Sequence, residues 1–140
     1  MIQPLVDLLA FNHWANLTLF DACLGLSDDQ LDTGIPGTAG SIRELLMHIA
    51  VAQHALVARA NGEQRSARGV WSSFDELLAT LRSGNDALIS LSGSLGDDPE
   101  IEIEREGRLY RFPRSFYVTS ASWHGAEHRT EIRLTLARWA

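Results

Sequence analysis

Apolar residues recur three or four positions apart along four long stretches of this chain, which is the spacing of amphipathic α-helices. Pro4 favours the first turn of a helix, and Gly93 is a natural end point. Ser41 and Glu44 form the pattern of a capping box, in which each side chain bonds to the other residue's backbone amide. The predicted helices cover approximately residues 4–24, 41–60, 73–92 and 115–139.

A different pattern precedes the last helix. From Glu100 to Arg105 apolar and charged side chains alternate, which is typical of a β-strand. Glu106 and Gly107 suit a tight turn into a second strand over residues 108–112. The fold class predicted is therefore all-α, a four-helix bundle with a short β-hairpin before the last helix. No linker or internal repeat divides residues 1–140, so a single domain is expected.

Composition excludes several classes of protein. The formal net charge is -6, and the 12 basic residues, all arginines, are scattered, so a nucleic-acid partner is not expected. Cys23 is the only cysteine, which excludes an internal disulfide, fits a reducing compartment and suggests an inert buried thiol. The N-terminus has no signal-peptide pattern, and no apolar run reaches the roughly 20 residues that cross a bilayer. We expect a cytoplasmic protein with no membrane partner.

Two histidines of the last helix are the first candidates for chemistry. His124 and His128 lie four residues apart, so their side chains are about 40° apart on one helical face. That face is also apolar, and core-facing imidazoles are costly unless their ring nitrogens find partners. A divalent cation would supply one. The pair alone leaves chance open, because two histidines four residues apart on a helix are only moderately specific for a metal. The H-E-x-x-H motif of metalloproteases is absent, since this segment reads H-G-A-E-H.

His48 is the third candidate, on an apolar flank of the second predicted helix. A core histidine with one hydrogen bond is the alternative interpretation of this residue. His54 lies about 120° around the same helix, so the two side chains are poorly placed to share a metal. His13 belongs to the first helix. We predict that His13 and His54 are structural or surface residues rather than ligands.

Several short motifs in the same order resemble the DinB/YfiT-like superfamily of metalloproteins. Residues 11–16 read F-N-H-W-A-N, where members of that superfamily have Y-N-x-W-A-N. Residues 41–48 read S-I-R-E-L-L-M-H, similar to S-I-x-x-L-x-x-H. Residues 124–129 read H-G-A-E-H-R, similar to the start of H-x-x-x-H-R-G-Q. The resemblance spans nearly the whole chain.

The resemblance implies an up-down-down-up order of the helices and one mononuclear divalent metal ion held by His48, His124 and His128. The metal stays open among Ni, Zn, Fe and Mn. Characterised relatives include transferases and isomerases that depend on small thiols, and many are dimers. A homodimer is also suggested by the apolar surface of the second helix, which includes Ala50 and Val57 together with Val51.

This sequence departs from the superfamily pattern at Thr130-Glu131, where G-Q is usual. Glu131 keeps to the face of His124 and His128. Its carboxylate would order a metal-bound water, hydrogen-bond a ligand histidine or bind the metal itself, and the sequence does not decide among these roles.

Three histidine ligands would leave coordination positions open, as in reactive metal sites. The first hypothesis is a metal-dependent enzyme that activates a small thiol for transfer to an electrophile, with a low-molecular-weight thiol as substrate. A metal-assisted hydrolase with Glu127 or Glu131 as general base is the second. A non-catalytic metal- or ligand-binding stress-response bundle is the third.

Overall fold

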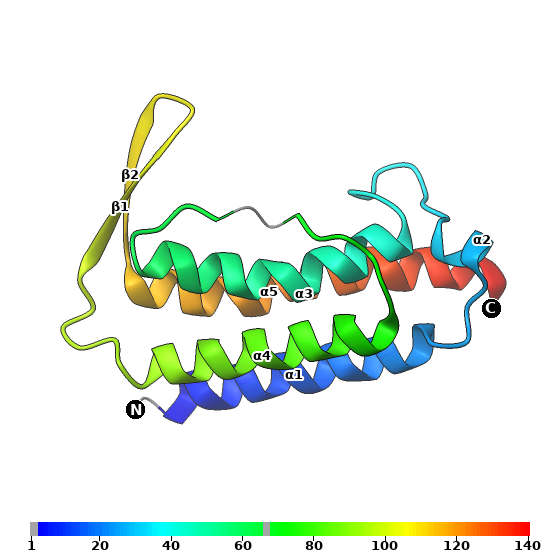
Figure 1. Cartoon of the computed structure of the whole chain (residues 1–140), viewed down its shortest axis with the longest axis horizontal. Helices are drawn as coiled ribbons and strands as arrows, with labels where there is room; N and C mark the ends of the chain where they lie inside the picture. The colour runs from blue at the N-terminus through cyan, green and yellow to red at the C-terminus, as the bar shows by residue number, and fades with distance from the viewer. Residues whose placement is uncertain (1–2, 66–67) are drawn as a thin grey trace.

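The computed structural model describes residues 3–65 and 68–140, and it confirms the predicted four-helix bundle (Figure 1). The elements are α1 (Gln3–Cys23), α2 (Asp28–Leu31), α3 (Ile42–Ala60), α4 (Phe74–Ser92), β1 (Glu100–Arg105), β2 (Arg108–Pro113), α5 (Arg114–Leu136) and η1 (Ala137–Trp139). Figure 1 shows α1 and α5 running in one direction and α3 and α4 in the other, which is the up-down-down-up order. The last turn of the predicted final helix is the separate 3-10 helix η1.

Local side chains fix where the helices begin. The Ser41 hydroxyl accepts a hydrogen bond from the Glu44 backbone N–H, and the Glu44 carboxylate accepts one from the Ser41 N–H at 2.8 Å. α5 begins after Pro113, which has no capping side chain. Asp98, in the connection between α4 and β1, fills that role, because its carboxylate accepts a 2.7 Å hydrogen bond from the Ser115 N–H.

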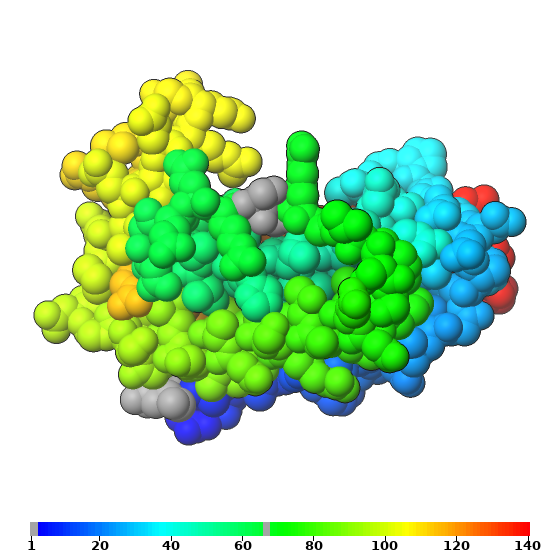
Figure 2. Space-filling model, viewed as in Figure 1, coloured from blue at the N-terminus to red at the C-terminus, as the bar shows by residue number. Residues whose placement is uncertain are grey.

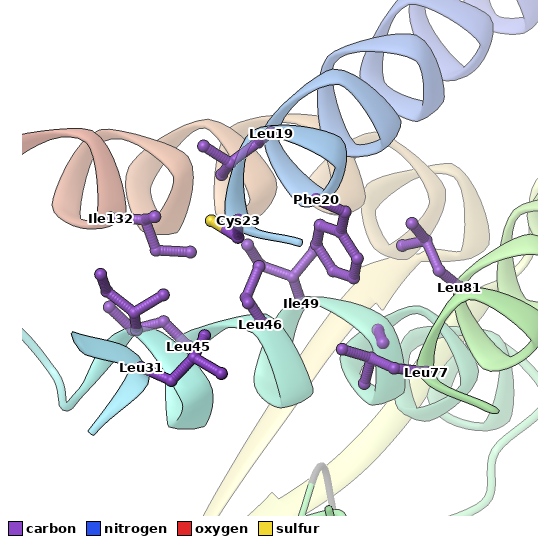
Figure 3. Packing of buried hydrophobic residues seen from close by; sticks show 12 residues of the cluster. Leu19, Phe20, Cys23, Leu31, Leu45, Leu46, Ile49, Leu77, Leu81 and Ile132 are labelled. Carbon is purple, nitrogen blue, oxygen red and sulfur yellow. The ribbon is translucent and has the colours of Figure 1, made fainter. Parts of the chain in front are cut away.

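The apolar core consists of two clusters, one toward each end of the bundle. The cluster near α2 includes Phe20, Leu46 and Ile132, all fully buried (Figure 3). The second cluster lies toward the hairpin and includes Leu9 and Leu88. Each cluster receives side chains from several helices, so both ends of the bundle are held by apolar packing.

Polar side chains occupy the level between the two clusters on each of the four long helices. The buried ones are Asn12 and Asn16 on α1, Gln53 on α3 and Asn85 on α4. On α5, His124 and His128 likewise lie between the residues that this helix contributes to the two clusters. A buried polar layer in an apolar bundle needs partners for its donors and acceptors, and it is therefore the place to look for a site.

The hairpin stands at one end of the bundle and projects away from the helices (Figures 1 and 2). β1 and β2 pair antiparallel from Glu100 opposite Pro113 to Arg105 opposite Arg108. The turn residues Glu106 and Gly107 both have positive φ, as a tight two-residue hairpin turn requires. In the described part of the chain, no helix is long and apolar enough to cross a membrane.

Candidate metal centre

The three candidate histidines meet between α3 and α5, which pack side by side. Nε2 of His48 lies 2.9 Å from Nε2 of His124, which in turn lies 3.2 Å from Nε2 of His128. All three residues are half-buried, and their rings are tilted or edge-on to one another. The ring nitrogens therefore converge on one point from two helices.

This arrangement fits a divalent metal ion. Nitrogen ligands lie about 2.0–2.1 Å from zinc, so two of them in a tetrahedral site are roughly 3.3 Å apart. The two measured Nε2 separations, 2.9 and 3.2 Å, are close to that spacing. A neutral imidazole carries one N–H, so the Nε2 of His124, facing two other nitrogens, can donate to only one of them. A cation can accept the lone pairs of all three rings.

Glu131 determines how the His128 ring is presented. Its Oε2 lies 2.6 Å from Nδ1 of His128, which places the ring proton on Nδ1 and directs the Nε2 lone pair toward the other histidines. Its Oε1 accepts a 2.9 Å hydrogen bond from the backbone N–H of Ala39, in the loop before α3. Of the three roles open from the sequence, the structure places Glu131 as the hydrogen-bond partner of His128.

The charge state of the central histidine also suits a ligand. The pKa of His124 is lowered to about 4, first because burial disfavours the charged ring. The neighbouring imidazoles of His128 and His48 lower it too, as does the guanidinium of Arg59. His124 is therefore neutral at physiological pH, and neutral imidazole is the form that binds metal.

The other two histidines lie elsewhere. Nε2 of His54 contacts the Thr80 carbonyl oxygen and the Ser83 hydroxyl, each at 3.1 Å, so this ring links α3 to α4. His13 faces α4, and its pKa is lowered because it is partly buried, with a smaller opposing effect from Asp86. Neither belongs to the convergent group formed by His48, His124 and His128 among the described residues.

A cavity of about 1050 Å³ opens beside two of the three histidines. His48 and His124 line it, together with aromatic residues of α5 and both strands of the hairpin. This volume is close to the upper limit of the range for small-molecule sites. Gln64 donates a 3.0 Å hydrogen bond to the Glu104 carbonyl, which joins the α3–α4 connection to the hairpin where both line the cavity.

The two acidic candidates lie on a different side. Glu127 is exposed, and it lines a shallow hollow on α5 together with His128 and Glu131. Neither carboxylate lines the larger cavity beside His48 and His124. The carboxylates that do line it are those of Glu104 and Glu106 in the hairpin, both exposed.

Comparison with known proteins agrees with this architecture. The DinB superfamily matches residues 13–132 of the chain. The chain belongs to the DinB superfamily. Its fold is similar to the crystal structure of a DinB-like protein from Bacillus cereus, with a TM-score of 0.73 and 16% sequence identity over 98% of this chain and 91% of that chain. No match was found among curated proteins.

In this DinB-superfamily chain, the motif F-N-H-W-A-N of α1 contacts the histidine motif of α5. Nη1 of Arg129, the residue after His128, donates 2.7 Å hydrogen bonds to Oδ1 of Asn12 and of Asn16. These asparagines are the two N positions of F-N-H-W-A-N, and both are buried. The motifs therefore fasten α1 to the helix that carries two of the three histidines.

Sequence reasoning missed two features of the site. The Ala39 amide that holds Glu131 lies 92 residues away in the chain, and nothing in the local pattern pointed to it. Arg59 lines the cavity but was not singled out. A signal for it was present, because Ala52, Ala55 and Arg59 follow His48 at intervals of four, three and four residues on one helical face.

Proposed function

We propose that this member of the DinB superfamily binds one divalent metal ion through His48, His124 and His128. The observation that carries the proposal is the convergence of three Nε2 atoms at separations of 2.9 and 3.2 Å, with Glu131 holding the His128 tautomer that offers Nε2. An imidazole set suits Zn, Ni and Fe better than Mg or Ca. Mn stays a further candidate.

We further propose that the bound metal serves an enzyme that transfers a small thiol to an electrophile. A set of three histidines leaves coordination positions open, and a cation there acidifies a thiol or water that it holds. His48 and His124 line the cavity, so a molecule in the cavity reaches the metal position. A cytoplasmic setting, where small thiols are reduced, is part of this proposal.

The chain's own residues define what the cavity can do. Phe116 and Tyr117 provide aromatic walls, and Trp123, half exposed, stands among the lining residues of α5. Such walls favour the apolar part of a substrate and exclude bulk water around it. Glu131, held by Ala39, keeps His128 oriented from outside the cavity.

Metal-assisted hydrolysis is less well supported, because it needs a base next to the reacting water. Glu131 is engaged with His128 and the Ala39 amide, and Glu127 is exposed and lines a separate shallow hollow on α5. Neither carboxylate lines the cavity. The thiol-transfer reaction needs no carboxylate base at that position, so it is the function we propose.

Metal binding is tested by elemental analysis of the purified protein after dialysis. We expect about one divalent ion per chain, with strong loss of occupancy in His48→Ala, His124→Ala and His128→Ala. His13→Ala is the matched control and should keep its metal, because that ring faces α4. Equal metal content in all four variants would exclude the site.

Activity is tested by the loss of free thiol from small thiols mixed with model electrophiles. The metal-loaded protein should accelerate that loss, and chelator-treated protein or His124→Ala should not. A protein that binds metal stoichiometrically but consumes no thiol with any electrophile would instead be a non-catalytic binder. Release of carboxylate from ester or amide substrates would favour the hydrolase.

A further inference from the structure

The cavity beside the histidines contains a positive charge that the proposed thiol chemistry does not use. Arg59 lies in the last turn of α3 and lines the cavity. It is half-buried, whereas the other cavity-lining arginines, Arg65 and Arg105, are exposed. A guanidinium that is partly removed from water loses part of its hydration free energy, and a carboxylate partner can restore it.

Arg59 differs in this respect from the other half-buried arginines. Arg43 pairs with Asp28 and Asp32, and Arg129 is held by asparagine side chains. Arg114 donates to backbone carbonyl oxygens of Ala60 and Ser94. No hydrogen bond or ion pair joins Arg59 to another residue in the part of the chain that the structure describes.

The guanidinium of Arg59 faces the same space as the histidines. Its positive charge opposes the rise that burial causes in the pKa of Tyr117. Both residues line the cavity. Arg59 follows His48 by eleven residues on the same helical face, a rise of about 16 Å along α3. Its side chain tilts toward the helix N-terminus, and therefore toward His48.

We infer that Arg59 binds a carboxylate of the substrate while the substrate's reactive end lies at His48 and His124. This inference rests on the proposed function and adds the substrate class, an amphipathic small molecule with a carboxylate at one end. A guanidinium and a carboxylate form two parallel hydrogen bonds in one plane. This ion pair is stronger where it is partly shielded from water. The aromatic walls between the two ends accept the apolar middle of such a molecule.

The charges at the rim do not reverse this preference. Glu104 and Glu106 carry negative charge, and Arg65 and Arg105 carry positive charge, so the exposed rim groups cancel in number. Exposed charges are also screened by water and salt. The half-buried Arg59 therefore decides which ligand charge the cavity favours, and its positive charge favours an anion.

The first experiment measures carboxylate binding without any thiol. Octanoate is titrated by calorimetry into wild-type protein, Arg59→Gln and the control Arg133→Gln, an exposed arginine of α5. All three proteins are studied both metal-loaded and chelator-treated, so that a carboxylate–metal contact is separated from one with Arg59. We expect about tenfold weaker binding in Arg59→Gln than in wild type or Arg133→Gln, in both states. A fourth protein, Arg59→Lys, keeps the charge but not the planar pair and should lose an intermediate amount of affinity. Equal affinity in wild type and Arg59→Gln, or no octanoate binding to wild type, overturns the inference.

The second experiment connects Arg59 to the metal position. Cobalt-loaded protein is titrated with 8-mercaptooctanoate and with its neutral partner 8-mercaptooctanol, and thiolate-to-cobalt absorption is followed. We expect the carboxylate to bind about tenfold more tightly than the alcohol, and this ratio to approach one in Arg59→Gln. If neither thiol changes the spectrum, the proposed thiol chemistry fails, while the octanoate titration still decides the role of Arg59. If both thiols bind equally well to wild type, the thiol proposal stands and the Arg59 inference fails.

Discussion

At the scale of single residues, the site depends on a hydrogen-bonded series that begins outside it. The Ala39 amide holds Glu131, Glu131 holds Nδ1 of His128, and Nε2 of His128 is thereby directed to the other histidines. Partners of this kind orient a ligand ring and raise its basicity. Glu131 therefore contributes through its negative charge as well as its position.

Glu131→Gln tests that contribution at nearly constant size. Loss of the charge should lower metal affinity roughly 10- to 100-fold, with the circular dichroism spectrum unchanged. Competition against a chromogenic chelator measures the affinity. Glu127→Gln removes an equivalent charge from an exposed position on the same helix, so it should change the metal affinity little. Equal affinities in the two variants would mean that Glu131 does not support the metal.

Cys23 should make the stability of the protein depend on pH in the alkaline range. The thiol is fully buried, and burial raises its pKa from 9.0 to about 11. Between these values the unfolded chain loses the proton while the folded chain keeps it, so the free energy of unfolding should fall as the pH rises from 9 to 11. Urea unfolding across this range should show a shallower decline in Cys23→Ala than in wild type. Parallel declines would contradict the assignment.

At the scale of secondary-structure elements, the contact between α1 and α5 requires a residue without a side chain. Gly125 separates His124 from the rest of the H-G-A-E-H motif and is buried against α1. A Cβ there would lie 2.7 Å from Oδ1 of Asn12 and 2.8 Å from Nη1 of Arg129. These two atoms are hydrogen-bonded to each other, so neither can move without breaking the link between the helices.

Gly125→Ala should therefore destabilise the protein in spite of the better helix propensity of alanine. Overpacking of this kind costs about 1–3 kcal/mol, and alanine recovers about 1 kcal/mol within a helix. We expect a net fall of about 1 kcal/mol in the free energy of unfolding, measured by urea titration. Gly25→Ala is the control, because nothing lies within 4 Å of the Cβ position there. A stabilised Gly125→Ala would contradict the close approach.

At the scale of the whole molecule, the apolar surface of α3 is smaller than the sequence suggested, and its Val51 and Val57 are half-buried. Ala50, one of the three residues on which the expected dimer surface of α3 was based, is fully buried within the monomer. Exposed large apolar side chains are found instead on α1, where Leu8, Phe11 and Trp14 are 40%, 57% and 61% exposed. Clusters of this kind on a surface helix often mark a protein–protein contact.

We therefore keep the prediction of a homodimer and move its surface to α1. Sedimentation equilibrium at micromolar concentration should give the mass of two chains. The double variant Phe11→Glu with Trp14→Glu should give a monomer, because two charges would be buried without partners. Val70→Glu places a charge at a 94% exposed apolar position on the α3–α4 connection and should leave the dimer intact. A monomeric wild type would rule the dimer out.

The positions of the helices and of the hairpin are determined by interactions between residues that are close in the sequence. Helical spacing located the four long helices, the pattern around Ser41 located the start of α3, and alternation located the hairpin. The shared face of His124 and His128 followed from their separation of four residues. Each of these features depends on interactions within one or two turns of chain, which a local pattern records.

The contacts between residues far apart in the sequence were determined only by how the helices pack together. This packing brought His48 within 2.9 Å of His124 across 76 residues and Glu131 to the Ala39 amide across 92. It buried Ala50, placed Arg129 against Asn12 and Asn16, and left Arg59 facing a cavity rather than a carboxylate. A helix's sequence shows which faces are apolar, but the rotation and neighbours of each helix are settled by how all the apolar faces are buried together.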